Sequence, residues 1–284
     1  MMGYVLFTKG HGTGNDFVIL PDPDGQLALT PELVAALCDR RTGIGADGVL
    51  RVIRSAKHPA AADVADQAEW FMDYWNADGS IAEMCGNGVR VFVRYLISSE
   101  LAEPAADGLP VATRAGVVRA AVGPDTITVR MGNPRVYAAS TATVGALTVP
   151  GVAVDCGNPH LVCALPDSVP LGALDLLHAP GYDPGLFPDG VNVEFVAPGK
   201  PPDGADLHVH MRVYERGSAE TRSCGSGALA VGAVALRDAG RAEGTVVIDV
   251  PGGRLTVTAD DGRWSLAGPA VLIATGEVDI AALS

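Results

Sequence analysis

The sequence of 284 residues carries little positive charge and no long apolar segment. Lys and Arg number 20 against 33 Asp and Glu, which gives a formal net charge of −13. A surface this acidic repels phosphate backbones and anionic lipid, so we expect neither nucleic acid nor a membrane as partner. The most apolar stretch, GALAVGAVAL, is far shorter than a bilayer span. The first residues, MMGYVLFTKGHG, lack a signal-peptide pattern, so we expect a cytoplasmic location.

Residues that usually hold metals, disulfides or pyridoxal phosphate are scarce. The 5 cysteines are odd in number and include no Cys-x-x-Cys, so neither a disulfide framework nor a structural zinc site is expected. His208 and His210 share one face of a predicted strand, but no third metal ligand lies near them in the sequence. None of the lysines lies at a helix start or a phosphate cradle, where a Schiff-base lysine would be expected. The chain is therefore predicted to need no metal or cofactor.

Local patterns predict many strands and three helices. Gly 35 and Pro 20 imply frequent turns, and alternating apolar segments bounded by glycines predict strands through most of the chain. The first helix is expected after Thr30, a good N-cap that is followed by Pro31. The second follows Cys85, and the third runs from Gly225 to about residue 236. Residues 178–190 are rich in Pro and Gly and predict an irregular loop.

The same short pattern occurs twice in the chain. Cys-Gly-Asn-Gly begins at Cys85 and Cys-Gly-Ser-Gly begins at Cys224, 139 residues later, and an apolar run follows each. A polar residue stands nine positions before each cysteine, Asn76 in one case and Glu215 in the other. A Gly-Asn turn also precedes each cysteine, with Asn15 in the first and Asn158 in the second. Two repeated features in the same order before each cysteine predict two structurally related halves. We expect an α+β fold with two similar domains, each with barrel-like antiparallel strands around one central helix.

A cysteine at the start of a helix lies in a positive field. The first N–H groups of the helix have no partner within it, and both they and the helix dipole favour thiolate over thiol. The N–H groups of residues 86–88 and 225–227 can then hold a carboxylate. Two such turns on opposite sides of one α-carbon would suit stereoinversion, with one thiolate removing the α-proton and the opposite thiol delivering another.

Several motifs together resemble one enzyme family. GTGNDF, NADGSIAEMCGNGVR, CGNPH, GVNVEF and YERGSAETRSCGSGA are similar to successive motifs of the diaminopimelate epimerases and occur in that family's order. The resemblance implies cofactor-independent conversion of LL-2,6-diaminopimelate to the meso form, in the synthesis of lysine and peptidoglycan precursors. It implies acid/base roles for Cys85 and Cys224, with His160 and Glu215 close to them and to the reacting amino group. It also implies a substrate-binding set: Asn15, Asn76, Gly86, Asn87, Asn158, Asn192, Glu215, Arg216, Gly225 and Ser226.

The chain departs from this family at two positions. Many members have glutamine where this chain has Gly48, and the second cysteine motif usually has glycine where this chain has Ala219. Proline racemases resemble the chain less, because their first turn has histidine at the place of Asn87, and the related phenazine-biosynthesis isomerases lack the paired cysteines. The resemblance further implies a homodimer and two domains, residues 1–131 with 268–284 and residues 132–267.

Two other functions are compatible with the pattern. A binding protein without catalytic activity would use the same two helix N-termini to capture a carboxylate ligand. An epimerase for another amino acid, such as proline, would use the same two thiols. A two-thiol enzyme is also expected to depend on a reductant, since thiols that flank one carbon can form a disulfide after modest movement.

Overall fold

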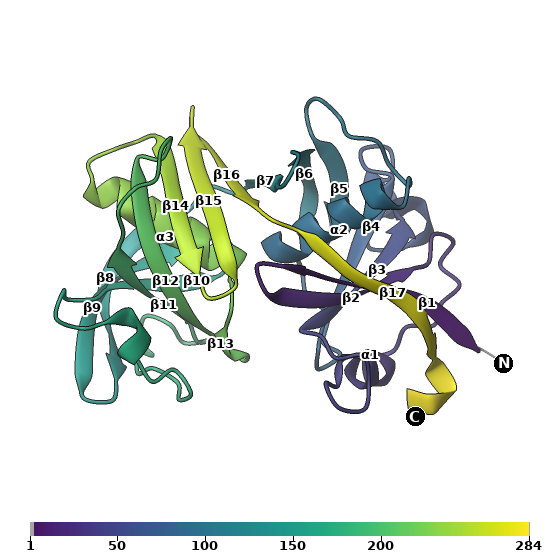
Figure 1. Ribbon diagram of the computed structural model, residues 1–284, viewed down its shortest axis with the longest axis horizontal. Helices are drawn as coiled ribbons and strands as arrows, with labels where there is room; N and C mark the ends of the chain where they lie inside the picture. The colour runs from purple at the N-terminus through teal and green to yellow at the C-terminus, as the bar shows by residue number, and fades with distance from the viewer. Residues whose placement is uncertain (1–2, 284) are drawn as a thin grey trace. The chain divides into compact units, whose positions relative to one another are not determined.

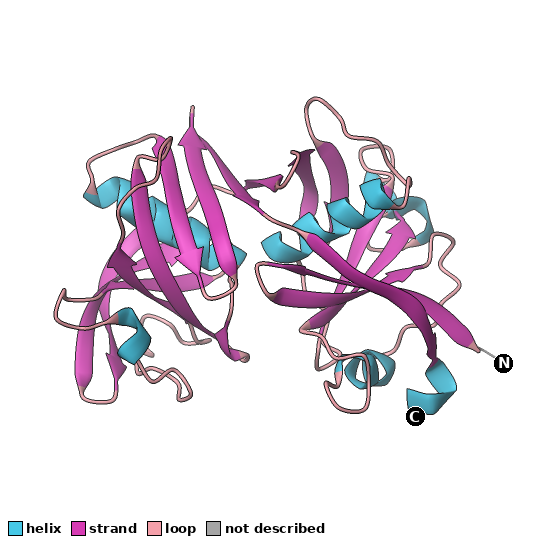
Figure 2. Cartoon of the chain, viewed as in Figure 1, coloured by secondary structure: helices cyan, strands magenta, loops and turns pink. Residues whose placement is uncertain are grey.

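The computed structural model describes residues 3–283. The chain divides into two compact units, which we describe separately. Unit 1 comprises the residues up to Val129 and those from Pro269 onward, and unit 2 comprises Arg130–Gly268. Figures 1 and 2 show that both units consist mainly of strands. The domain boundaries near Met131 and Gly268 that the resemblance implies stay a prediction.

Unit 1 is a mixed sheet with both antiparallel and parallel neighbours. β17 and β2 lie on either side of β1, β3 runs parallel to β2, β4 runs antiparallel to β3, and β5 runs parallel to β4. The connection from β4 to β5 contains the long helix α2. The elements are β1 (Tyr4–Gly12), β2 (Asn15–Pro21), α1 (Pro31–Cys38), β3 (Gly48–Arg54), β4 (Trp70–Asn76), α2 (Gly86–Ser98), β5 (Leu109–Thr113), β6 (Gly116–Val122), β7 (Ile127–Met131) and β17 (Val271–Asp279).

Unit 2 repeats this order of elements. β8 and β10 lie on either side of β9, β11 runs parallel to β10, β12 runs antiparallel to β11, and β14 runs parallel to β12. Helix α3 lies in the connection from β12 to β14. The elements are β8 (Arg135–Val144), β9 (Leu147–Asp155), β10 (Pro159–Ala164), β11 (Asn192–Pro198), β12 (Leu207–Glu215), β13 (Ala219–Thr221), α3 (Gly225–Asp238), β14 (Gly244–Val250), β15 (Gly253–Asp260) and β16 (Arg263–Gly268).

Apart from the short strand β13, which pairs with β12 in unit 2, the two units have the same order of parallel and antiparallel neighbours, with one helix at the same place in each order. The repeated sequence features lie at equivalent positions in the two units. Asn76 ends β4 and Glu215 ends β12. Asn15 begins β2, and Asn158 immediately precedes β10. The internal repeat and the α+β fold class are therefore confirmed.

The three predicted helices begin where their sequence signals place them. The Thr30 hydroxyl accepts a hydrogen bond from the Leu33 N–H at 3.3 Å, and Pro31 opens α1. The apolar face of α2, which includes Phe92 and Leu96, is completely buried. In α3 a side chain at Gly232 would meet the Val257 Cγ1 at 2.7 Å, so glycine allows close contact between the helix and β15.

Two cysteines belong to the apolar cores. Cys38 is the last residue of α1 and Cys163 lies in β10, and burial raises the pKa of each thiol to about 12. No disulfide joins cysteines of the described residues. Within residues 3–283, no helix combines the length and the apolar character that a membrane crossing requires.

Candidate active site

Each central helix has a cysteine as its N-cap. Cys85 caps α2 and Cys224 caps α3, both with extended backbone torsions, as is usual for N-caps. The Gly88 N–H donates to the Cys85 Sγ at 3.3 Å, and the Gly227 N–H donates to the Cys224 Sγ at 3.4 Å. These two N–H groups, which the sequence placed in a carboxylate cradle, are directed at the sulfurs instead. Fewer N–H groups of each turn are therefore available to a carboxylate than the sequence predicted.

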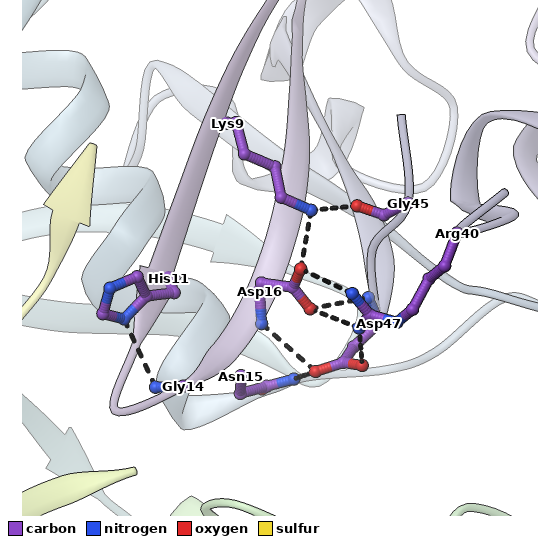
Figure 3. A network of polar contacts seen from close by, with 8 residues as sticks. All are labelled: Lys9, His11, Gly14, Asn15, Asp16, Arg40, Gly45 and Asp47. Atoms are coloured by element: carbon purple, nitrogen blue, oxygen red, sulfur yellow. Dashed lines mark hydrogen bonds and ion pairs between the residues drawn. The ribbon is translucent and has the colours of Figure 1, made fainter. Parts of the chain in front are cut away.

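In unit 1 the Cys85 turn is connected to the β1–β2 hairpin through Asn15. The Asn15 Oδ1 lies 3.6 Å from the Cys85 Sγ and accepts a hydrogen bond from the Asn87 Nδ2 at 3.2 Å. The other end of the same amide donates to the Asp47 Oδ2 at 2.9 Å (Figure 3). Three residues of the predicted site, Asn15, Cys85 and Asn87, thus lie together.

An ion-pair network fixes the start of β2, where Asn15 lies (Figure 3). The Asp16 carboxylate lies 2.6 Å from the Lys9 Nζ, and Arg40 contacts both Asp16 and Asp47 at 2.7 Å. Burial alone would raise the pKa of Asp16, but the hydrogen bonds from Arg40 and Lys9 outweigh burial and lower it to about 2. The asparagine is consequently held by a charged framework that persists at neutral pH.

A buried arginine lies behind the Cys85 turn. Arg90 is 0% exposed, and its guanidinium donates to the Asn87 Oδ1 at 2.5 Å, the Thr13 Oγ1 at 3.2 Å and the Pro269 carbonyl at 3.0 Å. Burial lowers the pKa of Arg90 to about 10, whereas a negative charge on Cys85 raises it. A cationic guanidinium at this place attracts a thiolate at Cys85.

Two other positions of unit 1 have a more local role. The Asn76 Nδ2 donates to the Ser80 Oγ at 3.0 Å, within the turn that follows β4. Gly48 faces the neighbouring strand so closely that an added Cβ would lie 2.5 Å from the Trp75 carbonyl oxygen. A glutamine side chain at position 48 is therefore incompatible with this backbone.

Cys224 differs from Cys85 in its surroundings. It is 5% exposed, and burial, followed by the charges of Glu215 and Glu194, raises the pKa of its thiol well above the usual value. The Gly227 N–H and the Ser226 hydroxyl, 3.6 Å from the sulfur, act in the opposite direction but do not compensate. A helix N-terminus by itself favours thiolate, but at Cys224 burial and two carboxyl groups act in the opposite direction and outweigh it.

His160 is part of a buried polar chain in unit 2. Its Nδ1 lies 2.7 Å from the Glu194 Oε1, and its Nε2 lies 3.1 Å from the Asn158 Oδ1. His160 and Glu194 are both 0% exposed. The structure thus brings two predicted residues, Asn158 and His160, together with a carboxyl group that the sequence interpretation did not select.

The remaining predicted residues of unit 2 lie around the end of β12. The Asn192 Oδ1 accepts the Arg216 backbone N–H at 2.9 Å, and the Arg216 guanidinium donates to the Asp189 carbonyl at 2.9 Å. The Thr221 hydroxyl donates to the Glu215 Oε1. Asn192 and Glu215 therefore position the segment that carries Arg216.

The Ala219 departure has a backbone consequence. Ala219 has φ +60°, a left-handed conformation in which a side chain costs about 1–2 kcal/mol. Glycine adopts this conformation without that cost, which gives the physical reason for a glycine at this place in the resembling motif.

His208, His210 and Asp249 lie within metal-binding distance of one another. The His208 Nε2 is 2.9 Å from the Asp249 Oδ2, its Nδ1 is 2.8 Å from the Lys200 carbonyl, and Arg254 donates to both Asp249 oxygens. Both nitrogens of His208 and both oxygens of Asp249 already have partners. The cluster is an ion-pair network of β12, β14 and β15.

The sequence interpretation missed Arg90 and Glu194. Each is the one charged residue in a short run that is otherwise apolar, VRVFV in α2 and VEFVA in β11. A charge in a segment predicted to be buried is a signal, since buried charges require partners. What the sequence did not show is which side chains these partners are.

The fold of the chain occurs in proteins of known structure. A solved PhzF-family phenazine biosynthesis protein from Bacillus anthracis has the same fold, with a TM-score of 0.72 at 18% identity, covering 98% of this chain and 99% of the other. A hydroxyproline epimerase from Agrobacterium vitis superposes with a TM-score of 0.67 at 17% identity, covering 98% and 93%. The chain thus has the two-domain α+β fold of these proteins.

Sequence comparison defines the family among proteins with this fold. The diaminopimelate epimerase family model matches residues 7–137 and 152–279. A diaminopimelate epimerase from Streptomyces coelicolor is 52% identical, covering 98% of this chain and 96% of its own. One from Rhodococcus opacus is 50% identical, covering 96% of each chain. The chain belongs to the diaminopimelate epimerase family.

Proposed function

We propose that the chain converts LL-2,6-diaminopimelate to the meso form through two thiols and without a cofactor. The observation that carries this proposal is the duplicated half-site, in which topologically equivalent helices α2 and α3 each begin at a cysteine. Inversion of one stereocentre needs a base and an acid on opposite faces of the carbon. A repeated unit supplies one such group in each half.

The reaction moves one proton off the α-carbon and another proton onto it. In the proposed mechanism a cysteine thiolate takes the α-proton, and the electron pair of the broken C–H bond delocalises onto the adjacent carboxylate. N–H groups at the first turns of the helices, from Gly86, Asn87, Gly225 and Ser226, stabilise that charge. The opposite thiol then donates its proton to the other face of the carbon, and the two sulfurs exchange roles in the reverse direction.

The surroundings of the two sulfurs support different resting states. A buried guanidinium, that of Arg90, lies behind Cys85, whereas burial, followed by the charges of Glu215 and Glu194, raises the pKa of the Cys224 thiol. Attraction to a cation favours thiolate, and proximity to carboxylates favours thiol. We therefore assign the resting thiolate to Cys85 and the resting thiol to Cys224.

The non-reacting end of diaminopimelate is itself a zwitterionic amino acid. Arg216 can hold its carboxylate, and asparagine amides can supply neutral donors and acceptors. The residues proposed for this role are Asn15, Asn76, Asn158, Asn192 and Arg216. His160 and Glu215 are proposed to lie next to the reacting amino group.

The proposed setting is the cytoplasmic synthesis of lysine and peptidoglycan precursors, with the chain acting as a homodimer. The chemistry needs no Schiff base, because both proton-transfer groups are thiols of the chain itself. Lys9, one of the few lysines, is held in an ion pair with Asp16 at 2.6 Å.

A side-by-side assay of diaminopimelate and proline tests the substrate assignment. The purified chain is incubated with a reductant and either LL-diaminopimelate or L-proline, and stereoisomers are separated by chiral chromatography. We expect meso-diaminopimelate to accumulate and proline to remain unchanged. Inversion of proline alone would identify proline, and not diaminopimelate, as the substrate. Binding of diaminopimelate without inversion of either amino acid would favour a non-catalytic binding protein.

A further inference from the structure

Glu194 is the one charged residue of β11 and is completely buried. Its neighbours in sequence, Val193 and Phe195, belong to the apolar core on one side of the strand. Successive side chains of a strand alternate between its faces, so Glu194 lies on the opposite face. A carboxyl group in this place is not part of the apolar core and requires polar partners.

One oxygen of Glu194 has a partner, and the other has none among the described residues. Oε1 lies 2.7 Å from the His160 Nδ1, while Oε2 is buried without a hydrogen bond. A buried carboxyl group with a single strong partner depends on that partner for its charge balance. The proton of this pair therefore lies along the line between Nδ1 and Oε1.

The other ring nitrogen of His160 connects the pair to the predicted substrate-binding set. Nε2 lies 3.1 Å from the Asn158 Oδ1, which can accept the Nε2 proton. With both nitrogens engaged, the ring cannot rotate or change tautomer without losing a hydrogen bond. Glu194 thus determines how His160 faces Asn158.

The Glu194 carboxyl also lies against the first turn of α3. A Cβ added at Gly227 would lie 2.6 Å from the Glu194 Oε1, so glycine at this position leaves room for the carboxyl. The N–H of the same Gly227 donates to the Cys224 Sγ. The carboxyl and the sulfur consequently contact the same residue of the helix.

We propose that Glu194 is a positioning residue of the Cys224 half-site, which orients His160 through a shared proton and sets its carboxyl against the first turn of α3, beside Gly227 and close to Cys224. This inference rests on the proposed epimerase function for its catalytic meaning. The charge of Glu194 acts on several titratable groups from neighbouring elements, and the charges of Glu215 and His160 act on Glu194 in turn. These groups are Cys156, His160, Cys163, Glu215 and Cys224.

The first test is independent of activity. Proton NMR of the full chain, labelled with ¹⁵N-histidine, should show a far-downfield proton coupled to the His160 Nδ1 in the wild type. The signal should be lost in Glu194→Gln and retained in the control Glu220→Gln, whose carboxyl pairs with Arg212 elsewhere in unit 2. Absence of the signal from the wild type, or its persistence in Glu194→Gln, would overturn the shared proton, and the wild-type spectrum decides this even if the variant does not fold.

The second test follows the pH dependence of kcat/KM for diaminopimelate. Removal of the Glu194 charge makes the Cys224 thiol more acidic, so the alkaline limb should move to lower pH by about one unit in Glu194→Gln. Glu220→Gln should keep the wild-type profile. Identical profiles for wild type and Glu194→Gln would overturn the influence of the Glu194 carboxyl on Cys224. An inactive wild-type chain would instead refute the proposed function, and the NMR result would still decide the His160–Glu194 contact.

Discussion

Replacement of the buried Arg90 by methionine tests whether the Cys85 turn depends on a guanidinium. The change removes donors from the Asn87 Oδ1, the Thr13 Oγ1 and the Pro269 carbonyl, which now lie 2.5, 3.2 and 3.0 Å from the guanidinium nitrogens. Hydrogen bonds from a charged donor contribute about 1.5–3 kcal/mol each. Methionine makes apolar contacts and avoids the cost of a buried cation, so part of the lost hydrogen-bond energy is offset.

The expected net loss is about 3 kcal/mol in the free energy of unfolding of unit 1. For a protein of this size each kcal/mol lowers the thermal midpoint by about 2–4 °C, so the midpoint should fall by about 6–12 °C. Trp70 and Trp75 lie in unit 1, and their fluorescence during urea unfolding, in a Trp264→Phe background, reports on that unit.

The matched control is Arg119→Met, which removes an arginine from an exposed ion pair with Asp107, 43% and 80% exposed. Such pairs contribute about 0–1 kcal/mol, so this variant should unfold like the wild type. An Arg90→Met variant that loses less than about 1 kcal/mol, or no more than Arg119→Met, would refute the reasoning.

Further predictions concern other places in the two half-sites. Gly227→Ala should lower both epimerase activity and the free energy of unfolding, the latter by about 1–3 kcal/mol, because its Cβ would lie 2.6 Å from the Glu194 Oε1; wild-type values in activity assays and urea titrations would contradict this close contact. Ala219→Gly should stabilise the chain by about 0.4–1 kcal/mol, since φ is +60° there; a lower thermal midpoint would be the opposite result. The folded-state pKa of Asp16 is depressed to about 2, so its contribution to stability is present above pH ~4 and lost as the pH falls towards ~2. In Asp16→Asn the thermal midpoint should therefore depend less on pH between about 4 and 2, and the free energy of unfolding should lose at most about 2 kcal/mol of its pH dependence. An unchanged pH dependence would exclude this role. Peroxide should inactivate the enzyme and thiol reductant should restore it, whereas full activity with both cap thiols still titratable would speak against a two-thiol site.

Much of the fold follows from local signals in the sequence. Thr30 followed by Pro31 predicts the start of α1, and a cysteine before Gly-x-Gly and an apolar run predicts α2 and α3. The repeated order of Gly-Asn turn, polar strand end and cysteine predicts two related halves, because those features recur in the same sequence along the chain. The structure confirms this at the level of strand pairing.

The charged partners of the site could not be predicted in this way. Glu194 and His160 are 34 residues apart in sequence, and they meet because β10 and β11 are neighbours in the sheet. The raised pKa of the Cys224 thiol likewise depends on burial and on Glu215 and Glu194, which the local sequence does not encode. The helix N-terminus favours thiolate at both cysteines, and the local sequence does not show that burial and two carboxyl groups oppose this at Cys224.

The most direct measurement of the two-thiol mechanism is deuterium incorporation from D₂O by wild type, Cys85→Ala and Cys224→Ala. Wild-type enzyme incubated with LL-diaminopimelate should produce meso-diaminopimelate with deuterium at the inverted α-carbon, because the delivered proton comes from a thiol that has exchanged with solvent. Each alanine variant should lose inversion completely while keeping the wild-type circular dichroism spectrum. Full inversion by either variant, or inversion by the wild type without deuterium, would contradict the mechanism.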